Sequence, residues 1–147
     1  MSYTKRFDAR KFDEPREMEA RAGIIKRADG SAMFRMGKTI AIAAVYGPRQ
    51  LYPSFLQDPE TGILRCNYDM LSFSVNDRKR PGPSRRSVEI SLVTTNALLP
   101  AIDLSGYPNT VVDVFIQVIQ ADAGTRCAGI CAASMALADA GIPMKDL

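Results

Sequence analysis

One stretch of alternating residues constrains the fold of this chain more than any other. Residues 110–122 have the sequence TVVDVFIQVIQAD, in which every second residue over most of the run is a branched apolar one. Such alternation predicts a β-strand with one buried face. The buried face would comprise Val112, Val114, Ile116 and Val118, opposite a mixed face of Val111, Asp113, Phe115 and Gln117.

Two helices are expected to cover the sheet to which this strand belongs. Residues 125–140 are rich in alanine and glycine, which would let a helix lie close to the sheet. Gly141 is a natural C-terminal cap for it, and Pro143 prevents the helix from continuing. The other helix should begin near Ser84. Its apolar face would be formed by residues spaced three and four apart, namely Val88, Leu92, Thr95, Leu99 and Ile102.

The first half of the chain has the pattern of an antiparallel meander. Its strands are expected over residues 19–28, 31–36 and 39–47, with tight turns at residues 29–30 and 37–38, and a further strand is expected over residues 63–71. A long loop occupies residues 48–62 and a basic loop occupies residues 74–87. Loops of this length in compact domains are often functional. Together these elements predict one α/β domain, with an antiparallel-rich sheet covered by helices.

The composition excludes several kinds of chemistry. The chain of 147 residues contains no histidine, so Ser-His-Asp and Cys-His catalysis and histidine metal sites are excluded. Its three cysteines form no CxxC pair, and Cys127 and Cys131 are expected to be small buried residues. No apolar run approaches the length of a membrane span, which favours a cytoplasmic protein without a membrane partner. The net charge of +3 is compatible with nucleic acid or phosphate partners.

Arginines stand at the starts of both expected helices, where the helix dipole disfavours a cation. Arg126 lies in the first turn of one helix, and Arg85 and Arg86 lie in the first turn of the other. Each placement costs roughly 0.3–1 kcal/mol at an exposed site unless an anion binds there. Gly124 would let an anion approach the backbone N–H groups, and Thr125 would add a hydroxyl donor. The two helix starts would then form a phosphate clamp.

The same residues also allow simpler interpretations. Arg126 would then be a solvated surface residue, and Arg86 would pair with Glu89 three positions further on. Thr125 would be an ordinary residue at a helix start or an N-cap, and the basic stretch would be a solvated loop. At this point the pattern indicates an anion site but not its chemistry.

Three long motifs follow one another along the chain. They are ADGSAMFRMGKTIAIAAVYGPR (28–49), FSVNDRKRPGPSRRSVEIS (73–91) and VDVFIQVIQADAGTRCAGICAASMALADAGIPMKDL (112–147). These motifs closely resemble the ribonuclease PH family, in particular the catalytic subunits of the archaeal exosome. The resemblance implies the ribonuclease PH fold, a β-rich α/β domain related to domain 2 of ribosomal protein S5. Residues 1–147 would form a single such domain that lacks the C-terminal part of the family.

The resemblance also implies a reaction. The chain would be a phosphate-dependent 3′→5′ exoribonuclease subunit, in which inorganic phosphate attacks the last phosphodiester of single-stranded RNA and releases a nucleoside diphosphate. Arg86, Gly124, Thr125 and Arg126 would bind the phosphate, and Arg86, Thr125 and Arg126 would be catalytic. A magnesium ion is implied as well, with no ligand in this chain. The acidic residues that the family uses follow the point at which this chain ends, so activity requires that they be supplied.

Further residues would contact RNA by the same resemblance. Arg49 and Tyr52 lie in the loop that would line the RNA path, where Tyr52 would stack on a base or simply pack against the protein. Contacts to the RNA backbone are expected from Arg85, Arg65, Arg78, Lys79 and Arg80.

The family assembles into six-membered rings. A related non-catalytic ribonuclease PH-like subunit and an RNA-binding cap subunit are therefore expected partners. The alternative function is a non-catalytic RNA-binding subunit of the same ring. The intact GTR and RRS motifs favour the enzyme. A kinase-like enzyme is disfavoured because the chain contains no GxxxxGK[ST] loop.

Overall fold

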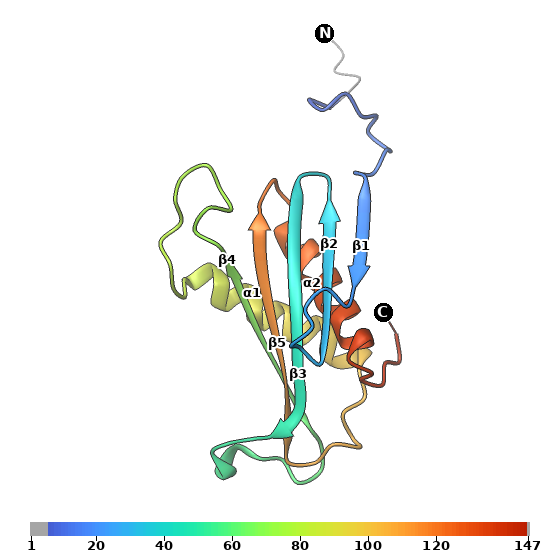
Figure 1. Cartoon of the computed structure of the whole chain (residues 1–147), viewed down its shortest axis with the longest axis vertical. Coiled ribbons are helices and arrows are strands. Elements are labelled where there is room, and N and C mark those ends of the chain that lie inside the picture. The colour runs from blue at the N-terminus through green and yellow to red at the C-terminus, as the bar shows by residue number, and fades with distance from the viewer. Residues whose placement is uncertain (1–5, 147) are drawn as a thin grey trace.

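The computed structural model describes residues 6–146 and places two helices behind one sheet (Figure 1). The strands are β1 (Met18–Ala22), β2 (Gly30–Met36), β3 (Thr39–Gln50), β4 (Ile63–Met70) and β5 (Thr110–Gln120). The helices are α1 (Arg85–Leu98) and α2 (Thr125–Asp139), with short 3₁₀ turns η1 (Ser54–Leu56) and η2 (Leu99–Ala101). This architecture confirms the predicted α/β class. No helix within the described range is both long and apolar enough to cross a membrane.

The sheet has the strand order β1-β2-β3-β5-β4 and contains one parallel pair. Neighbours from β1 to β5 pair antiparallel, whereas β4 and β5 run parallel, from Ile63 opposite Val111 to Met70 opposite Val118. A parallel pair needs a crossover connection, which α1 supplies. Because β4 and β5 end at the same edge of the sheet, the segments that follow them lead to α1 and α2 from that edge.

The apolar core lies between the sheet and the two helices. Val112, Val114, Ile116 and Val118 are fully buried there, as predicted from the alternation. Small residues of α2 face the sheet, namely Ala128, Gly129, Ala132, Ala133 and Ala136. A Cβ atom at Gly129 would already lie 3.2 Å from the side chain of Ile116 and 3.3 Å from the ring of Tyr68. The small side chains therefore set the close approach of α2 to β4 and β5.

α1 begins at the predicted residue. Ser84 is its N-cap, and its hydroxyl accepts a hydrogen bond from the backbone N–H of Ser87. The hydroxyl of Ser87 accepts one in return from the backbone N–H of Ser84. This reciprocal arrangement satisfies two donors and fixes the first turn of the helix.

The face that α1 buries differs from the predicted one. Val88 and Leu92 are 61% and 62% exposed, and Leu99 is exposed as well, so the prediction that these three are buried is wrong, whereas Ile102 beyond the helix is buried as expected. The buried residues of α1 are Ser87, Ile90, Thr94 and Leu98. The buried hydroxyl of Ser87 donates to the carbonyl of Ser84, whereas that of Thr94 has no hydrogen-bond partner among the described residues. An apolar ridge consequently remains on the side of α1 that faces away from the sheet.

The connection between β1 and β2 is longer than predicted. β1 ends at Ala22 and residues 23–29 form a loop, so there is no two-residue turn at residues 29–30. Gly30 belongs to β2, where a Cβ atom would lie 2.3 Å from the backbone nitrogen of Ala140. The glycine is therefore required by contact with the end of α2 and not by a turn. β3 extends to Gln50, beyond its expected end, whereas the tight turn at residues 37–38 is confirmed.

The cysteines differ in burial, and the expectation that Cys127 and Cys131 are buried is wrong. Cys127 is exposed and Cys131 is partly exposed, because both lie on the side of α2 that the sheet does not cover. Cys66 in β4 is the buried one. Burial raises the pKa of the Cys66 thiol to about 11, so this thiol remains protonated near neutral pH.

Candidate anion-binding site

The starts of α1 and α2 open into one cavity of about 560 Å³. Its lining comprises Met70, Val75, Lys79, Ser84, Arg86, Ala121, Ala123, Gly124, Thr125 and Arg126. The parallel pairing of β4 and β5 explains this arrangement, because both strands end at this edge and the following loops lead to the two helices. Arg86 and Arg126, which belong to different helices, therefore line the same cavity.

The start of α2 has the backbone features of an anion site. Gly124 precedes the helix with φ 74°, a left-handed conformation that glycine adopts without strain. No described side chain caps this helix, so its first N–H groups remain available to a ligand. Thr125 is buried at the first helical position, and Arg126 follows it on the exposed side. Free N–H groups next to an arginine favour an anionic ligand.

The turn before α2 is held by two residues that sequence reasoning missed. The hydroxyl of Thr39 donates to the carbonyl of Ala123 over 2.7 Å and accepts from the N–H of Asp122 over 2.9 Å. The guanidinium of Arg16 donates to the carbonyls of Asp122 and Ala123, over 2.8 and 3.0 Å. Thr39 and Arg16 are distant in sequence from this turn, and only the assembled sheet brings them to it.

Arg126 makes an ion pair at the cavity. Its Nη2 atom lies 2.8 Å from Oε1 of Glu89 in α1. The alternative pairing of Arg86 with Glu89 is therefore not the one observed. Arg86 makes no hydrogen bond or ion pair within residues 6–146. Arg86 thus lines the cavity without a partner. Arg126 is paired with the exposed carboxylate of Glu89, and an exposed ion pair of this kind contributes up to about 1 kcal/mol to stability.

Tyr68 lies beneath the two helix starts. Its side chain is fully buried, its ring faces Gly129, and its hydroxyl has no hydrogen-bond partner in the described part of the chain. Burial raises the pKa of Tyr68, while the nearby hydroxyl of Thr125 and the charges of Arg86 and Arg126 act in the opposite direction. The Thr125 hydroxyl interacts with the Tyr68 oxygen but does not reach hydrogen-bond geometry. Tyr68 therefore keeps a neutral hydroxyl under the cavity.

Two predicted RNA contacts, Arg49 and Tyr52, lie at the other end of the sheet from this cavity (Figure 1). Arg49 has a carboxylate oxygen of Asp29 at 3.5 Å, and its guanidinium lies 5.0 Å from the centre of the Tyr46 ring. Tyr52 is largely exposed, and its hydroxyl donates to the Gln50 side chain over 3.0 Å. The structure does not bring these residues to the anion site.

The remaining predicted RNA contacts are divided between two places. Arg65 binds both carboxylate oxygens of Asp113, over 2.5 and 2.9 Å, on the face of the sheet away from the helices. Lys79 pairs with Asp69, donates to the carbonyl of Met70 over 3.1 Å and lines the anion cavity. The basic residues Arg78, Arg80 and Arg85 are exposed in the loop before α1 and at its first position.

The described residues do not fit the magnesium ion that the resemblance implies. No group of three or more histidine, cysteine, aspartate or glutamate side chains between residues 6 and 146 is placed to hold a metal ion. Magnesium prefers a near-octahedral set of oxygen ligands, which usually includes one or two carboxylates. None of the described residues that line the anion cavity carries a carboxylate, and the carboxylates of Asp69 and Glu89 nearby are paired with the lining residues Lys79 and Arg126.

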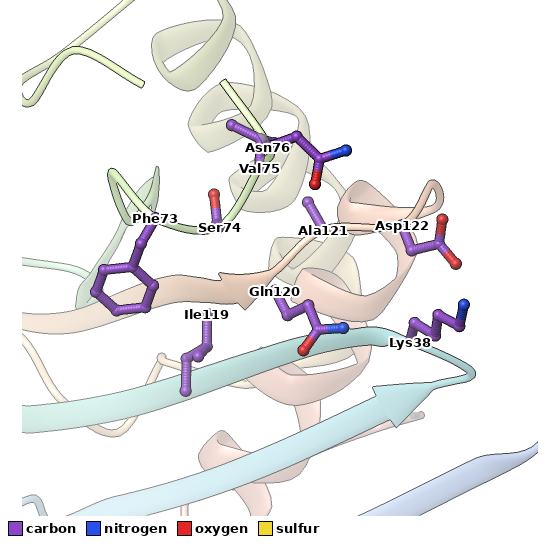
Figure 2. Close-up of a pocket in the computed structure, with 9 residues that line it drawn as sticks. All are labelled: Lys38, Phe73, Ser74, Val75, Asn76, Ile119, Gln120, Ala121 and Asp122. Carbon is purple, nitrogen blue, oxygen red and sulfur yellow. The ribbon is translucent and has the colours of Figure 1, made fainter. Parts of the chain in front are cut away.

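A second cavity of about 750 Å³ adjoins the anion site (Figure 2). Its lining comprises Lys38, Phe73, Ser74, Val75, Asn76, Ile119, Gln120, Ala121 and Asp122. Val75 and Ala121 also line the anion cavity. Sequence reasoning did not assign a site here, because the lining comes from a turn, a loop and a strand end that are far apart in the chain.

Comparison with known proteins assigns the chain to a family. Residues 14–143 match the family described as "3′ exoribonuclease family, domain 1". The chain is 57% identical over 142 residues to the exosome complex component Rrp41 of Methanopyrus kandleri, and 59% identical over 143 residues to that of Thermococcus kodakarensis. These matches cover 97% of this chain but 59% and 57% of the two relatives. The chain thus spans less than two thirds of the length of the curated relatives.

Solved structures share the fold. Rrp46 of rice superimposes with a TM-score of 0.83 at 28% identity, over 95% of this chain and 63% of that one. The Archaeoglobus fulgidus exosome with RNA bound to the active site gives a TM-score of 0.80 at 27% identity, over 92% of this chain and 56% of that one. The fold and the extent of the sequence match lead to one conclusion: the chain belongs to the 3′ exoribonuclease family and has its ribonuclease PH fold.

Proposed function

We propose that the chain is a subunit of a phosphate-dependent 3′→5′ exoribonuclease, and that inorganic phosphate binds in the cavity between the starts of α1 and α2. One observation carries this proposal: Arg86 and Arg126 line the same cavity as Gly124 and Thr125. A guanidinium group can donate two parallel hydrogen bonds to two oxygens of one phosphate. The free N–H groups at a helix start are further donors, and the helix dipole there favours a negative charge. The relatives named as exosome components, and the relative solved with RNA, support RNA as the substrate.

The proposed reaction joins two anions. An oxygen of inorganic phosphate attacks the phosphorus of the last phosphodiester, and the bond from that phosphorus to the 3′ oxygen of the preceding nucleotide breaks. The terminal nucleotide leaves as a nucleoside diphosphate, and the proton released by the phosphate goes to the 3′ oxygen. Repulsion and positioning are the main barriers. Arg86, Arg126 and the N–H groups of α2 would neutralise and orient the attacking phosphate.

Further parts are needed for turnover. The acid that serves the leaving 3′ oxygen is expected from the region of the relatives that this chain does not match, because the anion cavity has no carboxylate in its lining and the nearby Asp69 and Glu89 are already paired. A related ribonuclease PH-like subunit would complete a six-membered ring, and a cap subunit would supply additional RNA-binding surface. Contacts from Arg85, Arg49, Tyr52, Arg65, Arg78, Lys79 and Arg80 would guide RNA toward the cavity.

Phosphorolysis is tested with the chain combined with the region of a curated relative that it does not match, and with the ring partner. Single-stranded RNA and phosphate should yield nucleoside diphosphates. Arg126→Glu should lower the phosphate-dependent rate by at least about a hundredfold, because it removes a charge that stabilises the transition state. Arg27→Glu, at an exposed position in the loop before β2, is the matched control and should retain activity. Release of monophosphates, or unchanged activity of Arg126→Glu, would contradict the proposal.

A non-catalytic RNA-binding subunit of the same ring is the second candidate. The Glu89 carboxylate, which already satisfies Arg126 at 2.8 Å, favours it. Such a subunit would bind RNA without phosphate-dependent release of nucleotides. Calorimetry separates the two candidates, because the enzyme should bind inorganic phosphate and lose that binding in Arg86→Glu and Arg126→Glu, whereas the non-catalytic subunit should bind RNA but not phosphate.

A further inference from the structure

We propose that Arg16 is a positioning residue of the anion site: with Thr39, it fixes the turn of residues 122–124 so that the backbone N–H groups of this turn are presented to phosphate. The inference deepens the proposed function and rests on it for the identity of the anion. It gives a role in ligand binding to a side chain that lies outside the cavity and 106 positions before Asp122 in the sequence.

The turn before α2 has an unusual backbone conformation. Ala123 and Gly124 both have a positive φ, of 60° and 74°. Glycine adopts this left-handed conformation freely, but alanine adopts it only where the surrounding structure imposes it. The conformation of Ala123 therefore depends on the groups that hold the turn. Arg16 and Thr39 both bond to its carbonyl oxygen.

The carbonyl groups of the turn are held from one side. Nη1 of Arg16 donates to the carbonyl oxygens of Asp122 and Ala123, over 2.8 and 3.0 Å. The hydroxyl of Thr39 donates to the carbonyl of Ala123 over 2.7 Å and accepts from the N–H of Asp122 over 2.9 Å. In a trans peptide the C=O and N–H groups point in opposite directions. The N–H groups of Ala123 and Gly124 are therefore turned away from Arg16.

The N–H groups turned away from Arg16 belong to residues of the anion cavity. Ala123, Gly124 and Thr125 line this cavity, whereas Arg16 and Thr39 do not. A left-handed residue next to a helical one arranges successive N–H groups in a concave row that binds anions, and Gly124 followed by Thr125 is such a pair. The charge of Arg16 also polarises the peptide groups it contacts, which strengthens their N–H groups as donors.

The turn between β2 and β3 holds Arg16 in place. The N–H of Gly37 donates to the carbonyl of Glu17 over 2.8 Å. A Cβ atom at Gly37 would lie 3.2 Å from Cδ of Arg16, so the stem of the arginine passes close to this glycine. Figure 2 shows Lys38, from the same turn, at the same end of the second cavity as Asp122. Because its stem is packed, Arg16 loses little freedom when it binds the two carbonyls, and the site is organised before phosphate arrives.

The test titrates inorganic phosphate into the 147-residue chain by calorimetry. Arg16→Ala should weaken phosphate binding by about tenfold, because N–H groups that are no longer fixed contact the anion less well. It should remain folded, since Arg16 lies before β1 and outside the apolar core. Arg16→Lys should restore most of the affinity, because an ammonium group can donate to both carbonyls.

Arg10→Ala is the matched control. Arg10 belongs to the same N-terminal segment and carries the same charge, but it donates to Asp8 and Glu14 within that segment. Arg10→Ala should therefore bind phosphate as the unaltered chain does. A loss of affinity equal to that of Arg16→Ala would show that the net charge of the segment matters and the turn does not, and would overturn the proposal.

Thr39→Val separates the geometry of the turn from charge. This variant removes both hydrogen bonds of the hydroxyl without changing the net charge, so it should weaken phosphate binding, whereas Thr39→Ser should preserve it. Because Arg16 and Thr39 hold the same carbonyl, the losses in affinity in the double variant Arg16→Ala, Thr39→Val should not add up. Full additivity would overturn a shared action on the turn.

Two further measurements distinguish positioning from a merely structural role. In the ligand-free chain, Arg16→Ala should speed hydrogen exchange at the amide of Asp122, while the amides of β5 keep their rates. In the assembled enzyme described above, Arg16→Ala should raise the KM for phosphate by about tenfold and leave the KM for RNA unchanged. Equal changes in both KM values, with a lower unfolding temperature, would assign Arg16 to the stability of the fold and overturn the proposal.

The remaining outcomes separate this inference from the proposed function. Phosphate binding that is equally tight in Arg16→Ala and the unaltered chain overturns the positioning role and leaves the proposed function standing. Weaker phosphate binding in Arg16→Ala, with rescue by lysine, supports the positioning role even if the assembled enzyme releases no nucleoside diphosphates. An unaltered chain that binds no phosphate contradicts both.

Discussion

Nη2 of Arg126 lies 2.8 Å from the carboxylate of Glu89, so one ion pair connects α2 to α1 beside the anion cavity. The carboxylate binds the same guanidinium that a phosphate would need. Glu89 therefore competes with the proposed ligand, while Arg86 remains without an ion-pair partner within residues 6–146. The negative charge of Glu89 should therefore lower the affinity of the proposed site for phosphate.

Replacement of Glu89 by glutamine should tighten phosphate binding. The exposed pair contributes up to about 1 kcal/mol, so release of Arg126 should lower the phosphate dissociation constant by up to about fivefold. Isothermal titration with inorganic phosphate measures the change. Glu60→Gln, an exposed carboxylate in the loop before β4, serves as the control. Weaker phosphate binding in Glu89→Gln would show that the carboxylate helps to position Arg126.

Gly30 should be intolerant of a side chain. A Cβ atom there would lie 2.3 Å from the nitrogen of Ala140 and 2.4 Å from the carbonyl oxygen of Ala136, which are backbone atoms that cannot rotate away. Gly30→Ala should lower the free energy of unfolding by about 2–3 kcal/mol in urea denaturation. Gly106→Ala is the control, because a Cβ atom at Gly106 meets nothing within 4 Å. Equal stability of the two variants would contradict the close packing of β2 against α2.

Alkaline pH should destabilise the fold in part through Cys66. Burial raises the pKa of this thiol from 9.0 to about 11 in the folded state. The stabilising contribution is complete below pH 9 and is lost as the pH rises toward 11, because the unfolded chain then releases its proton first. Two pKa units set an upper limit of about 2.7 kcal/mol. Urea denaturation between pH 8 and pH 11 should show a shallower decline for Cys66→Ala, and parallel declines would refute this assignment.

Arg65 offers a test of RNA guidance along the sheet. It is paired with Asp113 on the face away from the helices. If it also contacts an RNA phosphate, Arg65→Gln should reduce the slope of log affinity against log salt by about 0.7, the value for one contact to a single strand. Asp113→Asn should strengthen RNA binding because it frees the guanidinium. Unchanged affinity and slope in both variants would remove Arg65 from the RNA path.

The sheet and the helix starts were accessible from sequence because they depend on local chemistry. Alternation in residues 110–122 gave the buried face of β5, and the serine at position 84 gave the start of α1. The apolar face of α1 was not accessible in the same way. Val88 and Leu92 have the right spacing for burial, but the buried residues include the polar Ser87 and Thr94 instead.

The candidate site likewise contains residues that local sequence reveals and residues that only the folded structure brings together. Gly124, Thr125, Arg126 and Arg86 could be grouped from sequence, because each sits at a recognisable helix start, and the structure places them around one cavity. Thr39 and Arg16 support the turn from distant parts of the chain, so no local pattern reveals them. The neighbouring cavity was missed for the same reason, since its lining is assembled only when β5 and the turn after β2 lie together.

The parallel pair of β4 and β5 places the proposed ligand-binding residues apart from most of the apolar core. The residues proposed to bind phosphate lie at the starts of α1 and α2, at one edge of the sheet, while the apolar core lies further along the strands and helices. Substitutions of the exposed Arg86 and Arg126 can therefore alter ligand binding with little penalty to the fold, whereas Gly124 and Thr125 are constrained by packing. Such a scaffold is well suited to diversification, because new specificities can arise through changes in the two segments that connect β4 to α1 and β5 to α2.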